Sequence, residues 1–300
     1  MTDPSTDPAR PGAGRPQDAT GPLDLDRALR ADLIATAEAA ADAARAAILP
    51  YFRRTDLDIA DKGAAADASG RSRFDPVTAA DHAAETAIRS VIATRRPEDG
   101  ILGEEQGHQT GRSGLTWVID PIDGTRAFLS GTPSWGVLIA LSDATGPRLG
   151  VIDQPWTGER FLGGLGAARL DSPHGRSRLA TRSPRPLAEA ILFTTFPEIG
   201  SAAERAAFER VARDVRLTRY GLDCYAYALI AAGQIDLVIE AGLHPYDVAA
   251  PIAVIEAAGG IVTDWQGGPA HDTARSGGRI LAAANPQVHA AALALLRDTG

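Results

Sequence analysis

Five short segments rich in aliphatic residues follow one another between residues 100 and 165, and they constrain the fold more than any other part of the chain. Glycine, proline and aspartate separate the segments, as is typical of consecutive strands. They are GILGEE (100–105), LTWVID (115–120), SWGVLIALSD (134–143), PRLGVIDQP (147–155) and RFLGGLG (160–166). This spacing predicts an antiparallel sheet in the first half of the chain.

Helical and strand patterns alternate after a Pro/Arg/Ser-rich stretch at 172–186. The predicted strands are AILFTTF (190–196), RLTRY (216–220), IDLVIEA (235–241), GIVTDW (260–265) and ILAAAN (280–285). The predicted helices are 201–213, 222–232, 246–258 and 286–297. Such alternation favours an α/β organisation. We expect halves at 24–180 and 181–300 that pack as one catalytic unit.

The region before residue 100 contains a tail and two helical patterns. Residues 1–23 are rich in Pro, Gly, Asp and Thr, which predicts a disordered tail without the apolar core of a signal peptide. Apolar residues recur every three or four positions from Leu25 to Phe52, which predicts a long helix. A short strand is expected at 57–63. Thr78 is a candidate N-cap of a second helix, whose inward residues are predicted to be Ala84, Ile88 and Val91.

Charge and cysteine content restrict the function. The formal net charge of −8 argues against a nucleic-acid or anionic-membrane surface. The chain lacks the run of about 18 apolar residues that a membrane helix needs. A single cysteine, Cys224, excludes an internal disulfide and fits a reducing compartment. The sequence therefore predicts a cytoplasmic protein.

The sequence DPIDGT (120–125) places two carboxylates three residues apart in a turn. Pro121 has no N–H, so we expect the chain to leave strand geometry after Asp120 and Asp123 to turn back towards it. Two carboxylates and the carbonyl of Ile122 are hard oxygen ligands of the kind that Mg²⁺ prefers. The amides after the turn can face an anion. These features together indicate metal-assisted phosphate chemistry.

Other acidic residues also fall at joints between predicted elements. They are Asp75, Asp81, Glu104, Glu105 and Asp247. Each acidic segment alone can be explained without a metal site, since an isolated D-x-x-D-G is more often a solvated turn and a lone Glu-Glu is usually surface charge. One metal site would explain all of them. Other chemistries fit less well, because the six histidines lack metal-ligand spacing and neither a G-x-S-x-G elbow nor a P-loop is present.

Four motifs resemble those of the inositol monophosphatase family of lithium-sensitive, Mg²⁺-dependent phosphatases. They are DPVTAAD (75–81), GEE (103–105), WVIDPIDGT (117–125) and HPYDVAAPIAVIEAAGG (244–260), in family order. The resemblance covers about residues 25–300. Tyr246 stands where many members have tryptophan, which is a conservative departure. The resemblance implies an α+β fold, a layered α-β-α-β-α sandwich, and a homodimer.

The resemblance also implies roles for individual residues. One Mg²⁺ would be held by Glu104, Asp120 and the Ile122 carbonyl, and a second by Asp120, Asp123 and Asp247. Asp81 would help to hold a weaker third ion through water, and Mn²⁺ is an alternative metal. Thr125 with Glu104 would orient and deprotonate the attacking water. The amides of Gly124 and Thr125 would hold phosphate oxygens, and Asp247 would also contact the substrate.

Substrate selectivity is expected from two further carboxylates, Asp223 and Glu240, placed by position near the leaving group. The runs GLDCYAY (221–227) and GTRAFLSGTPSWGVLIAL (124–141) resemble the histidinol-phosphatase branch of the family. Two carboxylates suit a leaving group with an ammonium and an imidazole, because charge-assisted hydrogen bonds are the stronger ones. Asp223 could instead cap the helix that begins near Cys224. The alternative functions are an inositol-1-phosphatase or broad sugar phosphatase, and a non-catalytic binding protein.

Overall fold

The computed structural model describes residues 25–55, 59–61 and 76–297. The predicted N-terminal tail, Asp75 and most of the strand expected at 57–63 lie outside these residues. The part of that strand that is described, β1 (Ile59–Asp61), pairs antiparallel with β2 (Pro76–Thr78). None of the described helices is long and apolar enough to cross a bilayer.

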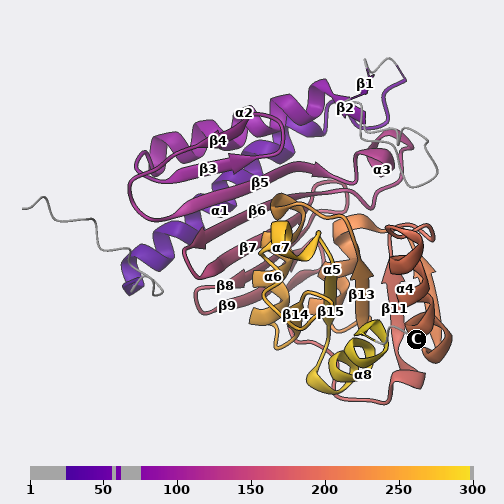
Figure 1. The fold of residues 1–300 in the computed structure, drawn as a ribbon. Helices are drawn as coiled ribbons and strands as arrows, with labels where there is room; N and C mark the ends of the chain where they lie inside the picture. The colour runs from indigo at the N-terminus through magenta and orange to yellow at the C-terminus, as the bar shows by residue number, and fades with distance from the viewer. Residues whose placement is uncertain (1–24, 56–58, 62–75, 298–300) are drawn as a thin grey trace, which may run out of the picture.

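The first half of the chain builds an eight-stranded sheet (Figure 1). Its strands are β3 (Gly100–Gly103), β4 (Gly107–Gln109), β5 (Thr116–Asp123), β6 (Gly136–Asp143), β7 (Gly146–Gln154), β8 (Glu159–Gly164), β9 (Ala167–Ser172) and β10 (Gly175–Arg178). They lie in the order β10-β9-β8-β7-β6-β5-β3-β4. Neighbours are antiparallel as predicted, except that β3 runs parallel to β5. This exception arises because β4 forms a hairpin at the edge, and the chain then returns to the other side of β3.

The sequence patterns missed the two strands β9 and β10. The residues of β9 are all half-buried and those of β10 are exposed, so neither strand shows the alternation of apolar and polar residues that marks a strand with one buried face. Part of the Pro/Arg/Ser-rich stretch at 172–186, for which no strand was predicted, is therefore the outer edge of the sheet.

The second half of the chain builds a five-stranded sheet of β11 (Ile191–Thr194), β12 (Leu217–Tyr220), β13 (Leu237–Glu240), β14 (Ile261–Thr263) and β15 (Ile280–Ala283). The order is β12-β11-β13-β15-β14. β11 is parallel to both of its neighbours, whereas β15 is antiparallel to both of its neighbours. The alternation predicted from the sequence is therefore present, but in a mixed sheet.

Helices form three layers around the two sheets, which gives the α-β-α-β-α sandwich (Figure 1). The first layer is α1 (Arg27–Ile48) and α2 (Ala79–Arg95); the middle layer is α5 (Asp223–Ala231) and α6 (Pro245–Ala257); the outer layer is α4 (Ala202–Asp214) and α8 (Pro286–Arg297). Short helical segments lie at α3 (Thr125–Leu129), α7 (Thr273–Ser276) and the 3-10 turn η1 (Leu187–Glu189). The fold is α+β, as the resemblance implied.

Alternation along the strands assigns each face of a sheet to its own core. In β5, Trp117 and Ile119 pack against α1 and α2, whereas Val118 faces the middle helices. In β13, Val238 faces the middle helices and Leu237 faces the outer layer. Successive side chains of a strand point to opposite faces, so the central strands of both sheets are buried on both sides.

Two predicted helix details differ in the structure. The first helix begins at Arg27, where the side chain of Asp26 accepts a hydrogen bond from the amide of Leu29 at 2.8 Å, and it ends at Ile48 rather than Phe52. In α2, whose N-cap is Thr78 as predicted, the fully buried position is Ile92 and Val91 is only half-buried. An i, i+4 repeat from Ala84 and Ile88 leads to Ile92.

Two glycines let α6 lie directly on the large sheet. A Cβ atom at Gly150 would lie 2.3 Å from the carbonyl oxygen of Ala250, and one at Gly163 would lie 2.5 Å from Cα of Val254. Neither contact is possible for a real side chain. The close approach anchors α6, whose first turn carries Asp247. The expected division into halves at residue 180 stays a prediction.

Candidate metal and phosphate site

The turn expected at DPIDGT lies at the end of β5. The strand does not end at Asp120 as predicted; it continues to Asp123 across an irregularity in its pairing with β6. Pro121, which has no N–H for the ladder, lies within this interruption, and such bulges redirect side chains. The amide of Ile122 donates to Oδ1 of Asp120 at 3.0 Å, which fixes the turn.

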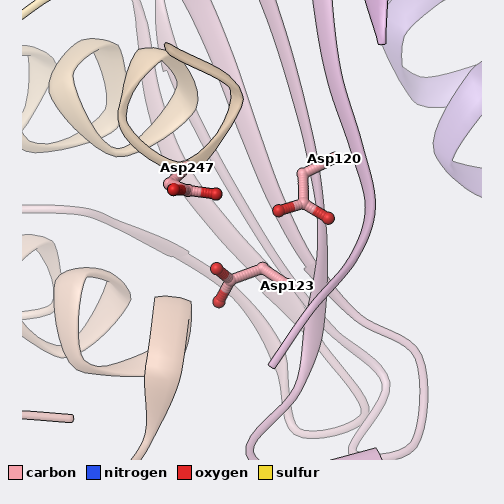
Figure 2. Close-up of side chains that lie close together, drawn as sticks. All are labelled: Asp120, Asp123 and Asp247. Carbon is pink, nitrogen blue, oxygen red and sulfur yellow. The ribbon is translucent and has the colours of Figure 1, made fainter. Parts of the chain in front are cut away.

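Three carboxylates converge at this turn (Figure 2). Asp120 and Asp123 come from the end of β5, and Asp247 comes from the first turn of α6. One oxygen of each lies within 4.8 Å of the others. The amide of His244 donates to Oδ2 of Asp247 at 2.7 Å and holds that carboxylate at the start of the helix. The structure thus brings together residues that are more than 120 positions apart in the sequence.

Mutual repulsion and burial disfavour the ionised form of the carboxylates of Asp120, Asp123 and Asp247, which we call the trio. Burial, and then the charges of Glu104, Asp123 and Asp247, raise the pKa of Asp120 well above its usual value. Burial, and then Asp223 and Asp247, also raise the pKa of Asp123. Burial raises the pKa of Asp247 to about 7. Crowded carboxylates of this kind are stabilised in their charged form by a bound cation, and their hard oxygens suit Mg²⁺.

Glu104 approaches the trio from the turn after β3, and a buried residue of α2 holds that turn. Glu85 accepts hydrogen bonds from the amides of Glu105 at 2.7 Å and Gln106 at 3.1 Å, and it pairs with Arg89 at 2.7 Å. Gly103 leaves space for it, since a Cβ atom there would lie 2.1 Å from Oε1 of Glu85. Glu85 was not predicted from the sequence. The signal that could have identified it is its spacing of four residues from Asp81, which puts both on the buried face of α2.

The residues after the turn form one wall of a cleft of about 300 Å³. Gly124 has a φ of 85°, a conformation that favours glycine, and it caps α3. The Thr125 hydroxyl donates to the carbonyl oxygen of Ile122 at 3.1 Å. Glu104, Asp120, Asp123 and Asp247 line the same cleft. A phosphate group placed there would lie next to the start of α3 and to any cation that these carboxylates hold.

Asp223 and Glu240 also line the cleft, and Asp223 lies against Gly124, where a Cβ atom would lie 2.8 Å from its Cγ. Asp223 is the first residue of α5, and its Oδ2 accepts from the Ser134 hydroxyl at 3.2 Å. Burial and the charge of Glu240 raise the pKa of Asp223 to about 6. Glu240 accepts from the Thr195 amide at 2.9 Å and from the Tyr227 hydroxyl at 2.8 Å.

The alternative role of Asp223 as a helix cap is wrong. Leu222 is the N-cap of α5, and no side chain hydrogen-bonds there as a cap. The amide of Cys224 instead donates to Oδ2 of Asp123 at 2.6 Å. The carboxylate of Asp223 is therefore not used to begin its own helix.

Asp81 is placed differently from the other predicted residues. It is buried in the first turn of α2, where its Oδ2 accepts from the amide and the hydroxyl of Thr78 at 2.8 and 2.7 Å. It is not among the described residues that line the cleft. The water-mediated third ion at Asp81 stays a prediction, and Asp75, another acidic residue singled out in the sequence, lies outside the described residues.

Sequence reasoning did not assign two further residues of the cleft wall. Arg126 follows Thr125 in α3, and its guanidinium carbon lies 5.4 Å from the ring centroid of Phe196. Both residues line the cleft, and Arg126 is the only arginine among its described lining residues. The sequence did contain a signal for Arg126, because this arginine directly follows Gly124 and Thr125, whose amides are predicted to hold phosphate. Phe196, which belongs to a loop 70 residues later, gave none.

Comparison with known proteins places this geometry in a family. The model of the inositol monophosphatase family matches residues 29–300. Among curated proteins, the bifunctional phosphatase IMPL2, chloroplastic, of Arabidopsis thaliana is 44% identical over 235 residues, which cover 78% of this chain and 64% of that protein. The chain therefore spans less than two thirds of the length of this relative.

Two further similarities point to different substrates. A histidinol-phosphatase of Chlorobaculum parvum is 36% identical over 222 residues, which cover 73% of this chain and 80% of that protein. The solved structure of an inositol monophosphatase from Zymomonas mobilis matches with a TM-score of 0.76 and 36% identity. The match covers 91% of this chain and all of the Zymomonas chain.

Proposed function

The chain belongs to the inositol monophosphatase family, and from that premise we propose that it is a Mg²⁺-dependent phosphoric monoester hydrolase whose preferred substrate is L-histidinol phosphate. The reaction would consume water and release L-histidinol and inorganic phosphate, as a step of histidine biosynthesis. The proposal includes a cytoplasmic homodimer.

Two carboxylates of the cleft outside the trio support the proposed substrate. Asp223 and Glu240 line the space next to the metal trio without belonging to it. A leaving alcohol with an ammonium and an imidazole would receive charge-assisted hydrogen bonds from these carboxylates, whereas a neutral polyol would gain less. The similarity to the Chlorobaculum histidinol-phosphatase supports the same substrate.

The donor set fits magnesium. One ion would be held by Glu104, Asp120 and the Ile122 carbonyl, and a second by Asp120, Asp123 and Asp247; all of these groups are oxygen donors at one end of the cleft. When bound, the ions would neutralise the trio, polarise the phosphate and make water more acidic. Mn²⁺ would suit the same ligands.

The chain itself would contribute orientation and proton transfer. The Thr125 hydroxyl, which lies against the Ile122 carbonyl, would orient the attacking water with Glu104 as proton acceptor. The amides of Gly124 and Thr125 would hold phosphate oxygens at the start of α3. Asp223 and Glu240, which line the same cleft, would position the leaving alcohol.

Phosphate release by the purified protein with Mg²⁺ tests the proposal. We expect kcat/KM for histidinol phosphate to exceed that for inositol-1-phosphate and fructose-1,6-bisphosphate by about a hundredfold, as a site with matched charged partners can achieve. Comparable rates would overturn the substrate and favour a broad sugar phosphatase, in keeping with the similarity to the Zymomonas inositol monophosphatase. No release from any ester would overturn the hydrolase itself and favour a binding role.

A further inference from the structure

The wall of the cleft contains a flat cation packed on an aromatic ring. Arg126 is the second residue of α3, and its guanidinium carbon lies 5.4 Å from the centroid of the Phe196 ring. Phe196 belongs to the loop that follows β11. Both side chains line the cleft, and the Asp and Glu residues among its described lining residues outnumber the single arginine. The pair therefore forms part of the cleft wall and joins α3 to the loop after β11.

This pair lies on the side of the cleft where the leaving group is expected. The positive charge of Arg126 acts on Asp223, whose pKa it lowers against the larger effect of burial. Asp223 in turn lies against the start of α3, since a Cβ atom at Gly124 would lie 2.8 Å from its Cγ. Arg126 and Asp223 are therefore close to each other and to the start of α3, and the guanidinium packs on the ring of Phe196.

We propose that Arg126, supported by Phe196, is a specificity-determining residue that stacks on a planar ring of the leaving alcohol. A guanidinium is planar, weakly hydrated and stacks on flat π systems, whereas an ammonium is a compact charge without a face. A polyol has no flat surface to offer. The identity of the ring as an imidazole rests on the proposed function; the selection of flat leaving groups does not.

The competing role for Arg126 is a simple charge that attracts the phosphate. The two roles differ in what lysine can replace. A phosphate contact needs only the positive charge, so Arg126→Lys would keep it and Arg126→Gln would remove it for every ester alike. A stacking face is lost in Arg126→Lys even though the charge stays.

The test uses p-nitrophenyl phosphate as a flat ester and glycerol 2-phosphate as a polyol ester, with the full-length protein and Mg²⁺. Each ester is compared with itself in the wild-type protein, so the intrinsic lability of the nitrophenyl ester cancels. We expect Arg126→Lys to lower the flat-to-polyol ratio of kcat/KM by about tenfold, the upper end of what stacking of two planar groups contributes. Phe196→Leu should lower it in the same direction, because the guanidinium loses its support.

Binding of the product gives an independent measurement without phosphate. The inhibition constant of L-histidinol should rise about tenfold in Arg126→Lys. Arg112→Lys is the matched control, since Arg112 is highly exposed and pairs with Glu98 away from the cleft; it should leave both quantities at wild-type values. Melting temperatures of all variants show whether each is folded.

The outcomes separate this inference from the proposed function. An unchanged ratio in Arg126→Lys, with equal losses on both esters in Arg126→Gln, would overturn the stacking role in favour of phosphate attraction. A wild-type protein without preference for histidinol phosphate, whose ratio still falls in Arg126→Lys, would overturn the substrate and support the stacking wall. A clear preference of the wild-type protein for histidinol phosphate, with an unchanged ratio in Arg126→Lys, would support the substrate and overturn the stacking role of Arg126.

Discussion

The main-chain amide of Cys224 donates a 2.6 Å hydrogen bond to Oδ2 of Asp123, across 101 positions of the sequence. This contact joins the first turn of α5 to the end of β5 and lowers the pKa of Asp123 against the effects of burial and of Asp223 and Asp247. An amide at the start of a helix stabilises a nearby anion. The helix thus orients Asp123 towards the other carboxylates of the trio and leaves Asp223 to face the cleft.

Asp123→Asn should reduce turnover by about two or more orders of magnitude at saturating Mg²⁺, because a charged ligand shared between metal and substrate positioning is lost. The fold should persist, since the amide oxygen of asparagine can still accept from Cys224 and one repulsive charge is removed from the trio. Steady-state kinetics and the melting temperature check this prediction. Near-normal kcat would rule out Asp123 as a metal ligand.

The metal-free protein should lose stability as pH rises from about 4 to about 7. The pKa of Asp223 is raised to about 6 and that of Asp247 to about 7, so the folded state binds more protons than the unfolded state in this window. Deprotonation then favours unfolding when no cation is present. Melting temperatures in chelator at pH 5.5 and 7.5 should show the lower value at pH 7.5.

Mg²⁺ should stabilise the protein more at pH 7.5 than at pH 5.5, because metal ligands must be deprotonated. Taking the difference between Mg²⁺ and chelator at each pH cancels groups outside the site, such as His289, whose lowered pKa acts in the opposite direction. A Mg²⁺-induced shift that is larger at pH 5.5 would contradict the assignment of the trio as metal ligands.

Asp223→Asn should reduce kcat/KM for histidinol phosphate by about tenfold more than for a neutral sugar phosphate, since a charge-assisted hydrogen bond becomes a neutral one. The melting temperature should change little, because Asp223 does not cap α5. Equal losses on both esters would show that Asp223 supports structure rather than recognition. Ser134→Ala, which removes only the hydroxyl that contacts Asp223, is the milder companion variant.

Gly150→Ala should lower the free energy of unfolding by about 1–3 kcal/mol, because its Cβ would overlap the backbone of α6. The displaced helix carries Asp247, so the Mg²⁺ concentration needed for half-maximal activity should also rise. Gly166→Ala is the control: its Cβ meets nothing within 4 Å, and its φ of 88° alone costs about 1–2 kcal/mol. Equal effects of the two substitutions on unfolding and on the Mg²⁺ requirement would mean that α6 does not depend on the close approach.

Several features of the fold could be predicted because they depend on neighbouring residues. The start of α2 at Thr78 follows from local hydrogen bonding, and the position of the strands β5 to β8 follows from short aliphatic runs bounded by glycine, proline and aspartate. The outer strands β9 and β10 could not be predicted, since a strand without one fully buried face has no regular pattern. The parallel pairing of β3 with β5 was also hidden, because it depends on the path of the chain through β4.

The sequence by itself determined which chemical groups the site contains. The motif from Asp120 to Thr125 specifies a turn, its carboxylates and its glycine within six residues, and such local geometry needs no distant partner. It also determined which faces of the helices and strands are apolar, and therefore that layers must stack.

Only the tertiary structure decided which of these groups meet. Asp247 joins Asp120 because glycines let α6 lie on the large sheet, and Asp123 is oriented by the amide of Cys224. Arg126 meets Phe196 because a loop after β11 reaches the same cleft. Each contact joins segments whose separation in the sequence carries no periodic signal. They are fixed by the packing of whole layers, in which burial of all the apolar faces at once selects one arrangement.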